Sequence, residues 1–324
     1  MARIFIDGFE SGNLDCWDEV YLTTPNVITG ANVASGIYAL DLDWNGNYLM
    51  KNVPDSATYY MQLRTYGTSL GGRAVCSFFE DTIQHVNIVY NGSSYIDGRR
   101  DNTSVEVGQL MSTYTQYLIE VYVYIHESAG RIVVKVNGII TIDFTGDTQN
   151  GGTGIINKIR IGADSNNNSD LTFDDIVIDD AQYPNGSRIF GLSPNGVGNS
   201  SQWTPLFGSN YDRVNDVPEV DTEYVSVNTN DQVDTYAIAN MSTSPDQIRS
   251  VQVMARARSE GAATPTNLAL VVRSNGADYV GSDKLLSSEF ANGHTAIWEN
   301  DPDTATLWIE SGVNAMEAGI KSRA

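Results

Sequence analysis

Short β-forming runs separated by turn-forming dipeptides recur along the chain, and this pattern constrains the fold more than any other feature. The runs are rich in Val, Ile, Phe, Tyr and Thr, and Gly-Asn, Asn-Gly, Pro-Asp or Gly-Gly pairs lie between them. Many short strands at this spacing, with almost no helical periodicity, are typical of a β-sandwich or a barrel. The sequence therefore predicts an all-β protein. The runs in the first half are Tyr38–Leu42, Tyr59–Leu63, Ala74–Phe79, Val86–Tyr90, Tyr117–Ile125, Ile155–Ile161 and Leu171–Ile178.

The clearest hairpin is VVKVNGIITIDF, residues 133–144, in which Asn137-Gly138 suits a two-residue type I′ turn. Such a turn pairs Lys135 with Ile140, and paired residues point to the same face. The apolar residues of the two strands then fall on opposite faces, so either the turn is looser or both faces are partly covered. We expect the second face to be covered by the second domain, a third structural element or a neighbouring subunit. The residues expected between the sheets are Ile140, Ile142 and Phe144.

The charge balance argues against several classes of partner. Acidic residues outnumber basic ones 40 to 19, for a net charge of −21. Such a surface repels phosphate backbones and anionic lipids, so we expect no nucleic-acid binding. No apolar run approaches the roughly 20 residues that cross a bilayer, and the N-terminus has no apolar signal segment, so we expect neither membrane insertion nor secretion. Two cysteines cannot build a disulfide framework, so Cys16 and Cys76 are expected to be free thiols, with a single bridge between them as the alternative.

The composition divides the chain into two halves. Residues 183–205 are rich in Gly, Pro, Asn and Ser, as connections are. We therefore expect two tandem β-sandwich, jelly-roll-like domains, at 1–185 and 186–324. The β-rich runs of the second half are Glu223–Val227, Asp234–Ala239, Ile248–Arg258 and Leu268–Ser274.

The C-terminal segment has a different pattern. Its apolar residues stand at near-helical spacing, which predicts a short helix after Asp303 or Thr306. We expect this helix to dock on the second domain. The docking residues would be Leu307, Val313, Met316 and Ile320.

The first half resembles a known superfamily through three blocks: FIDGFESGNLDCWD, YLIEVYVYIHESAGRIVVKVNGIITIDFTGD and IRIGADSNNNSDLTFDDIVID. Together they resemble the concanavalin A-like lectin/glucanase superfamily in its laminin-G-type branch, over about residues 1–182. The resemblance implies a jelly roll of two antiparallel sheets. Members of that superfamily bind sugars, bind proteins, cut glycans or build particles, so the fold alone does not fix the function.

The second half resembles a segment that follows such modules in tailed-bacteriophage virion proteins. The blocks that carry this likeness are LSPNGVGNSSQWTP, DTEYV, SVQVMARARSEG and DPDTATLW. The resemblance implies an arrangement of elements and no enzyme activity. It places the chain in a particle assembled in the host cytoplasm.

Three carboxylates in Glu219-Val-Asp221-Thr-Glu223 form the sharpest catalytic candidate. Glycan-cleaving members of the lectin/glucanase superfamily carry an E-x-D-x-E strand, whose alternation puts three carboxylates on one face for retaining hydrolysis. Here the motif lies outside the resembling region, and Thr222 replaces an apolar residue. We therefore expect a solvated acidic loop, and assign no catalytic residue.

A second candidate is the oxygen-rich segment 164–170, which has Asp174 and Asp175 downstream. Oxygen ligands at alternate positions suit a hard cation such as Ca²⁺. Ser169 stands where an EF-hand turn has Gly, and strands flank the segment instead of helices. The competing interpretation is an Asn-rich loop whose side chains cap its own backbone. We expect the loop and assign no cofactor-binding or metal residue, with Ca²⁺ as the alternative.

Aromatic side chains are the third candidate, for binding carbohydrate. Sugar-binding jelly rolls stack rings against a pyranose, whereas aromatic residues also fill cores and anchor protein interfaces. The alternation of Tyr117–Ile125 puts Glu120, Tyr122 and Tyr124 on one face. The candidates are Trp17, Trp44, Tyr48, Tyr59, Tyr60, Tyr66, Tyr122 and Tyr124. The histidines share no metal-ligand spacing, so ordinary structural or surface roles are expected for His85, His126 and His294.

These observations favour a non-enzymatic structural component of a tailed-phage virion that acts by protein–protein assembly. The partners would be tail-tube, tail-tip or capsid subunits and further copies of the chain. A distal tail protein is favoured over a capsid decoration protein, because lectin-like folds commonly sit near the host-contacting end. The alternative function is a carbohydrate-binding adhesin module that contacts host-surface glycan.

Overall fold

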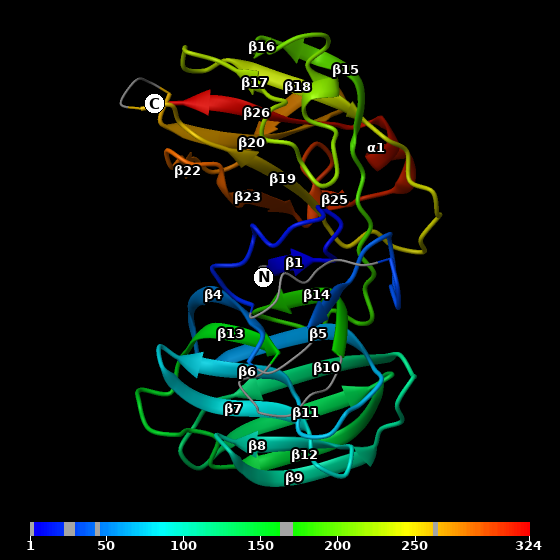
Figure 1. The fold of residues 1–324 in the computed structure, drawn as a ribbon, viewed down its shortest axis with the longest axis vertical. Coiled ribbons are helices and arrows are strands. Elements are labelled where there is room, and N and C mark those ends of the chain that lie inside the picture. Colours follow the sequence, from blue (N-terminus) through cyan, green and yellow to red (C-terminus); the bar gives the residue numbers. More distant parts are fainter. Residues whose placement is uncertain (1–2, 23–29, 43–45, 163–170, 262–264) are drawn as a thin grey trace. The chain divides into compact units, whose positions relative to one another are not determined.

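The computed structural model describes residues 3–22, 30–42, 46–162, 171–261 and 265–324 (Figure 1). The chain forms two compact units, Met1–Phe190 and Gly191–Ala324. Strands dominate both units, and the α-helix α1 (Glu310–Ala315) is short. The prediction of an all-β protein built from tandem β-sandwich domains is therefore confirmed.

Unit 1 is a jelly-roll-like sandwich of two seven-stranded antiparallel sheets, called sheet A and sheet B (Figure 1). Sheet A runs in the order β1 (Arg3–Asp7), β14 (Leu171–Asp179), β5 (Thr58–Gly67), β10 (Tyr117–Tyr124), β11 (Gly130–Val136) and β12 (Ile139–Gly146), with β3 (Leu40–Leu42) beside β14. Sheet B runs β2 (Glu19–Tyr21), β4 (Tyr48–Ser56), β13 (Ile156–Gly162), β6 (Ala74–Glu80), β7 (Ile83–Tyr90), β8 (Tyr95–Arg100) and β9 (Thr103–Leu110).

The core of unit 1 lies between the sheets and follows the period of two expected for strands. On β10 the inward residues Ile119, Val121 and Val123 are fully buried. Their neighbours Tyr122 and Tyr124 point to the opposite, outer face and are half-buried. The alternation predicted for Tyr117–Ile125 is therefore present, and the Tyr-rich face is the one away from the core.

A β-bulge resolves the awkward pattern of the hairpin at 133–144. Asn137 and Gly138 have φ values of 50° and 82°, as a type I′ turn requires, and Lys135 pairs with Ile140. The register then shifts, so that Val134 pairs with Ile142 and Thr141 is the extra residue.

The bulge explains why the predictions for Ile142 and Phe144 are correct and the prediction for Ile140 is wrong. Ile142 is fully buried and Phe144 is half-buried, as expected between the sheets. The expectation for Ile140 is wrong, because the residue precedes the bulge, lies on the outer face and is 54% exposed. The outer face is covered in part by Tyr183, whose ring lies 3.4 Å from Lys135 Nζ. A third structural element of the same unit thus supplies the cover.

That element is the strap, residues 180–190, which follows β14 and still belongs to unit 1. The Ile189 amide donates to Asp175 Oδ1 at 2.8 Å and the Ser187 amide donates to Gln62 Oε1 at 3.0 Å. Composition placed a boundary after residue 185, inside this strap. The hydrogen bonds explain why the compact unit extends to Phe190.

Unit 2 contains a six-stranded antiparallel sheet and the two-stranded sheet of β19 (Val251–Ala257) and β23 (Ala291–Trp298). The larger sheet runs β15 (Pro194–Ser201), β18 (Val233–Ile238), β26 (Glu317–Arg323), β20 (Asn267–Ser274) and β21 (Ala277–Val280), with β22 (Lys284–Leu285) beside β20. Short ladders join β16 (Thr204–Pro205) to β17 (Val225–Ser226) and β24 (Asn300–Asp301) to β25 (Thr306–Leu307). The core comprises Val253, Leu268, Leu270, Val272, Trp308, Val313 and Met316.

Two expectations for the second half are corrected in detail. The segment 183–205 is not all connection, because β15 lies within it and pairs with β18. The helix ends at Ala315, so Val313 and Met316 dock as predicted, whereas Ile320 lies on β26 and Leu307 is 44% exposed. The near-helical spacing of apolar residues extends past the helix into β26, because spacing over so few residues does not distinguish a helix from a strand.

The two cysteines form no disulfide: Cys16 and Cys76 are both buried and free. In the part of the chain that the structure describes, no helix has the length and hydrophobicity needed to cross a bilayer.

The bulge makes a prediction about two neighbouring isoleucines of β12. Ile142→Ala should lower the free energy of unfolding by about 2–4 kcal/mol, because it opens a cavity in a close-packed core. Ile140→Ala should change it by less than about 0.5 kcal/mol, because that side chain is largely in water. Calorimetric unfolding of the full chain measures both, and equal effects would mean that the register of β12 is wrong.

Candidate functional site

The carboxylates of the candidate catalytic motif do not form a catalytic strand. Residues 219–223 form a turn, so the alternation that would align three carboxylates is missing. Asp221 forms a two-bond ion pair with Arg256 at 2.8 and 3.0 Å, and Glu219 lies 3.5 Å from the same guanidinium. Glu223 pairs instead with Arg213. The prediction of an acidic loop therefore agrees with the structure.

The candidate Ca²⁺ segment, residues 164–170, lies outside the described residues. Asp174 and Asp175 downstream are described and are engaged with protein donors. Within the described ranges, no group of three or more His, Cys, Asp and Glu side chains is arranged to hold a metal ion.

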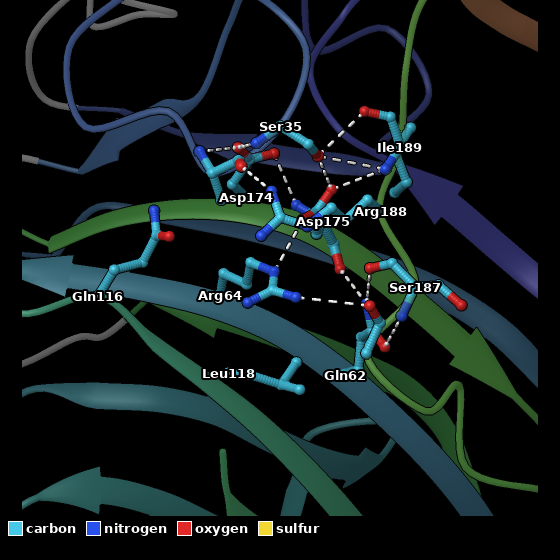
Figure 2. Close-up of polar contacts among 12 residues, drawn as sticks. Ser35, Gln62, Arg64, Gln116, Leu118, Asp174, Asp175, Ser187, Arg188 and Ile189 are labelled. Carbon is cyan, nitrogen blue, oxygen red and sulfur yellow. Dashed lines mark hydrogen bonds and ion pairs between the residues drawn. The ribbon is translucent and has the colours of Figure 1, made fainter. Parts of the chain in front are cut away.

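Asp174 and Asp175 form a buried carboxylate cluster on β14 (Figure 2). The register between β14 and β5 shifts between Asp174 and Val177, and Asp175 has a φ of 50°. This irregularity lets two adjacent carboxylates reach the same residue. Asp174 Oδ2 accepts from the amides of Ala34 and Ser35 at 2.7 and 3.2 Å, while Asp175 accepts from the Ser35 hydroxyl.

The same cluster holds the strap on the sheet. Arg64 of β5 donates from Nε to Asp175 Oδ2 at 2.9 Å, and the Ile189 amide donates to Asp175 Oδ1. Figure 2 shows Gln62 reaching the strap beside Arg64, where its Nε2 donates to the Ser187 carbonyl at 2.6 Å. These donors satisfy the buried carboxylates, so the cluster is a structural clamp.

Burial raises the pKa of both carboxyl groups, Asp174 and Asp175. Loss of water, together with the neighbouring charge of Asp175, raises the pKa of Asp174 to about 7. Burial also raises the pKa of Asp175, against the opposing effects of Ser35, Ile189 and Arg64.

The aromatic candidates separate into core and surface groups. Trp17 is buried and donates from Nε1 to Asp7 Oδ2 at 2.7 Å, and Tyr59 is fully buried between the sheets. Tyr48 stacks on Tyr21 on sheet B, with ring centroids 5.4 Å apart. Trp44 lies outside the described residues.

Three tyrosine rings meet on the outer side of sheet A. Tyr60 of β5 and Tyr122 of β10 pair across adjacent strands, with ring centroids 4.8 Å apart. Tyr183 of the strap packs edge-on against Tyr60 at 5.1 Å. We call Tyr60, Tyr122 and Tyr183 the tyrosine face. Each ring is half-buried, so the face combines packed aromatic carbon with exposed edges.

Charged groups border the tyrosine face. Lys135 Nζ lies over the Tyr183 ring, a cation–π contact. Arg131 forms a two-bond ion pair with Asp143 at 2.9 and 3.0 Å, and its charge acts on Tyr122 and Tyr183. Burial, followed by the neighbouring Tyr60, raises the pKa of Tyr122, so its phenol stays neutral.

The sequence predicts part of this face. Tyr60 and Tyr122 are among its aromatic candidates, whereas Tyr183 and Lys135 are not. Tyr183 lies in a segment with the composition of a connection, and Lys135 was considered only as a hairpin residue. The visible signal was the Tyr-rich outer alternation of Tyr117–Ile125.

No family model matches the chain, and no curated protein matches it. Among solved structures, a sialidase is similar over 56% of this chain and 19% of its own, with 11% identity and a TM-score of 0.43. Trypanosoma rangeli sialidase is similar over 43% of this chain and 25% of its own, at 12% identity and a TM-score of 0.35. A mutant of the alginate lyase Aly36B in complex with alginate tetrasaccharide is similar over 48% of this chain and 87% of its own, at 12% identity and a TM-score of 0.34.

The chain thus spans about a fifth to a quarter of the length of these sialidases. The likeness concerns the β-sandwich fold, and no activity or site residue is carried over from these proteins at such identities.

These comparisons contradict the function expected from the sequence. Sialidase and alginate lyase are carbohydrate-active enzymes, not structural proteins of a virion. The expectation of a non-enzymatic tailed-phage component is therefore wrong, together with the expectation that the chain is not an enzyme. The tailed-phage expectation came from the order of motifs in the second half of the chain. That order does not indicate any catalytic or binding chemistry.

Asp174 makes stability depend on pH. Its folded-state pKa lies above the ordinary value, so its contribution to stability is full below about pH 4 and is lost as the pH rises through about 7. We expect the unfolding temperature of the full chain to decline more between about pH 5 and 8 in the wild type than in Asp174→Asn. Calorimetry at several pH values measures the difference, and parallel profiles would contradict it.

Proposed function

We propose that unit 1 binds carbohydrate at the tyrosine face. The observation that carries this proposal is the contact of three half-buried tyrosine rings on the outer side of sheet A, away from the core. Single exposed apolar residues are common on protein surfaces, but a contiguous aromatic group outside the core marks a contact site.

The chemistry of the face suits a sugar. A pyranose presents C–H groups on its ring faces, which pack on aromatic carbon, and hydroxyls at its rim, which need hydrogen-bond partners. Tyrosine offers both an apolar ring and a polar tip. The Arg131–Asp143 ion pair stands beside the rings and supplies polar groups that orient a ligand.

The rigid support of the face also favours binding. Tyr60 and Tyr122 stand on central strands of sheet A, and the carboxylate clamp fixes the strap that carries Tyr183. A ligand then meets rings that are already ordered, so less conformational entropy is lost on binding. The resemblance of residues 1–182 to concanavalin A-like lectins supports the same function.

The proposal predicts that Tyr122→Ala weakens saccharide binding by at least about tenfold, because it removes one of the three rings of the face, the one that packs against Tyr60. The matched control is Tyr21→Ala, which removes one ring of the stacked Tyr21–Tyr48 pair on sheet B. A glycan array with the full chain identifies a binding saccharide, and titration calorimetry then compares the variants. Absence of binding to every saccharide, or equal losses in both variants, would contradict the proposal.

A further inference from the structure

Glu120 is a buried carboxylate at the base of the tyrosine face. Its neighbours across β10 are Gln62 on β5 and Lys135 on β11, and it shares the outer side of the strand with Tyr122. The residue is 3% exposed, and its Oε1 is buried without a hydrogen-bond partner.

The adjacent donors are directed elsewhere. Gln62 Nε2 donates to the carbonyls of Asp175 and Ser187, at 3.2 and 2.6 Å. Lys135 Nζ lies 3.4 Å from the centroid of the Tyr183 ring, and among the described residues no ion pair joins it to Glu120. Burying a carboxylate oxygen that accepts no hydrogen bond costs free energy. A ligand that donates a hydrogen bond to Glu120 Oε1 would offset this cost.

The surroundings favour a positively charged donor. Aromatic rings attract cations to their faces, and Lys135 shows that an ammonium group is accommodated against Tyr183. Glu120 adds its charge to the field at Tyr183. The net charge of −21 attracts cations to the whole chain and repels anionic saccharides.

We propose that the tyrosine face recognises a saccharide with a free amino group, of the glucosamine type. The ligand ammonium donates to Glu120 and takes the place of the Lys135 ammonium against Tyr183, while the Lys135 side chain swings into solvent. The pyranose ring packs on Tyr122. This inference rests on the proposed carbohydrate binding and adds the chemical class of the ligand.

The free amino group distinguishes the proposed ligand from other saccharides. An N-acetylated sugar keeps the pyranose ring but loses the positive charge, and a uronate brings a carboxylate next to Glu120. The site therefore ranks free-amine oligosaccharides first, N-acetylated ones second and uronates last.

Titration calorimetry of the full chain tests this ranking with β-1,4-linked glucosamine oligosaccharides, their N-acetylated counterparts and oligo-alginate. We expect the free-amine ligand to bind at least about tenfold more tightly than the N-acetylated one, and its affinity to fall as salt is raised. Glu120→Gln should abolish that preference. The matched control is Glu127→Gln, which removes the same charge from an exposed residue that follows β10.

A second variant keeps the test decisive if Glu120→Gln does not fold. Lys135→Met removes the competing ammonium and should raise the affinity for the free-amine ligand several-fold. If free-amine and N-acetylated ligands bind equally and both are lost in Tyr122→Ala, the amine preference is wrong and the carbohydrate site stands. If no saccharide of any class binds, both proposals fail.

Discussion

The hydrogen bonds of Asp175 are the interaction on which the outer side of sheet A depends. One buried carboxylate accepts from Arg64 of β5, from Ser35 of a distant loop and from Ile189 of the strap. Without these donors the charge would be uncompensated in a dry site, which is strongly destabilising. Because they are present, the strap is fixed over the sheet, and Tyr183 is held against Tyr60 and Lys135.

The outer side of sheet A carries both satisfied and unsatisfied buried carboxylates. Asp174 and Asp175 have protein donors for their oxygens, so they act in structure. Glu120 lies on the same side of the sheet and is nearly as deeply buried, yet its Oε1 has no donor. Burial alone therefore does not identify a binding residue, whereas burial with a missing partner points to a ligand.

The sequence predicted the fold class because strand alternation and turn chemistry are local. Asn137-Gly138 and the alternation of Tyr117–Ile125 required no tertiary information. The bulge at Thr141 could not be read in this way, since one extra residue reverses every later side chain without a compositional mark. Tyr183 was missed for the opposite reason: its role depends on strands far away in the sequence, and its own segment has the composition of a linker.

The bulged residue also joins the edges of the two sheets. Thr141 Oγ1 accepts from the amide of Gln109 on β9 at 2.6 Å, and Gly108 permits the close approach, since a Cβ there would lie 2.6 Å from the same oxygen. An edge strand with free amides is a template for pairing with another chain. Thr141 uses one of those amides and holds β9 beside β12. The irregularity that sets the hairpin register thereby protects this border of unit 1 from edge-to-edge aggregation.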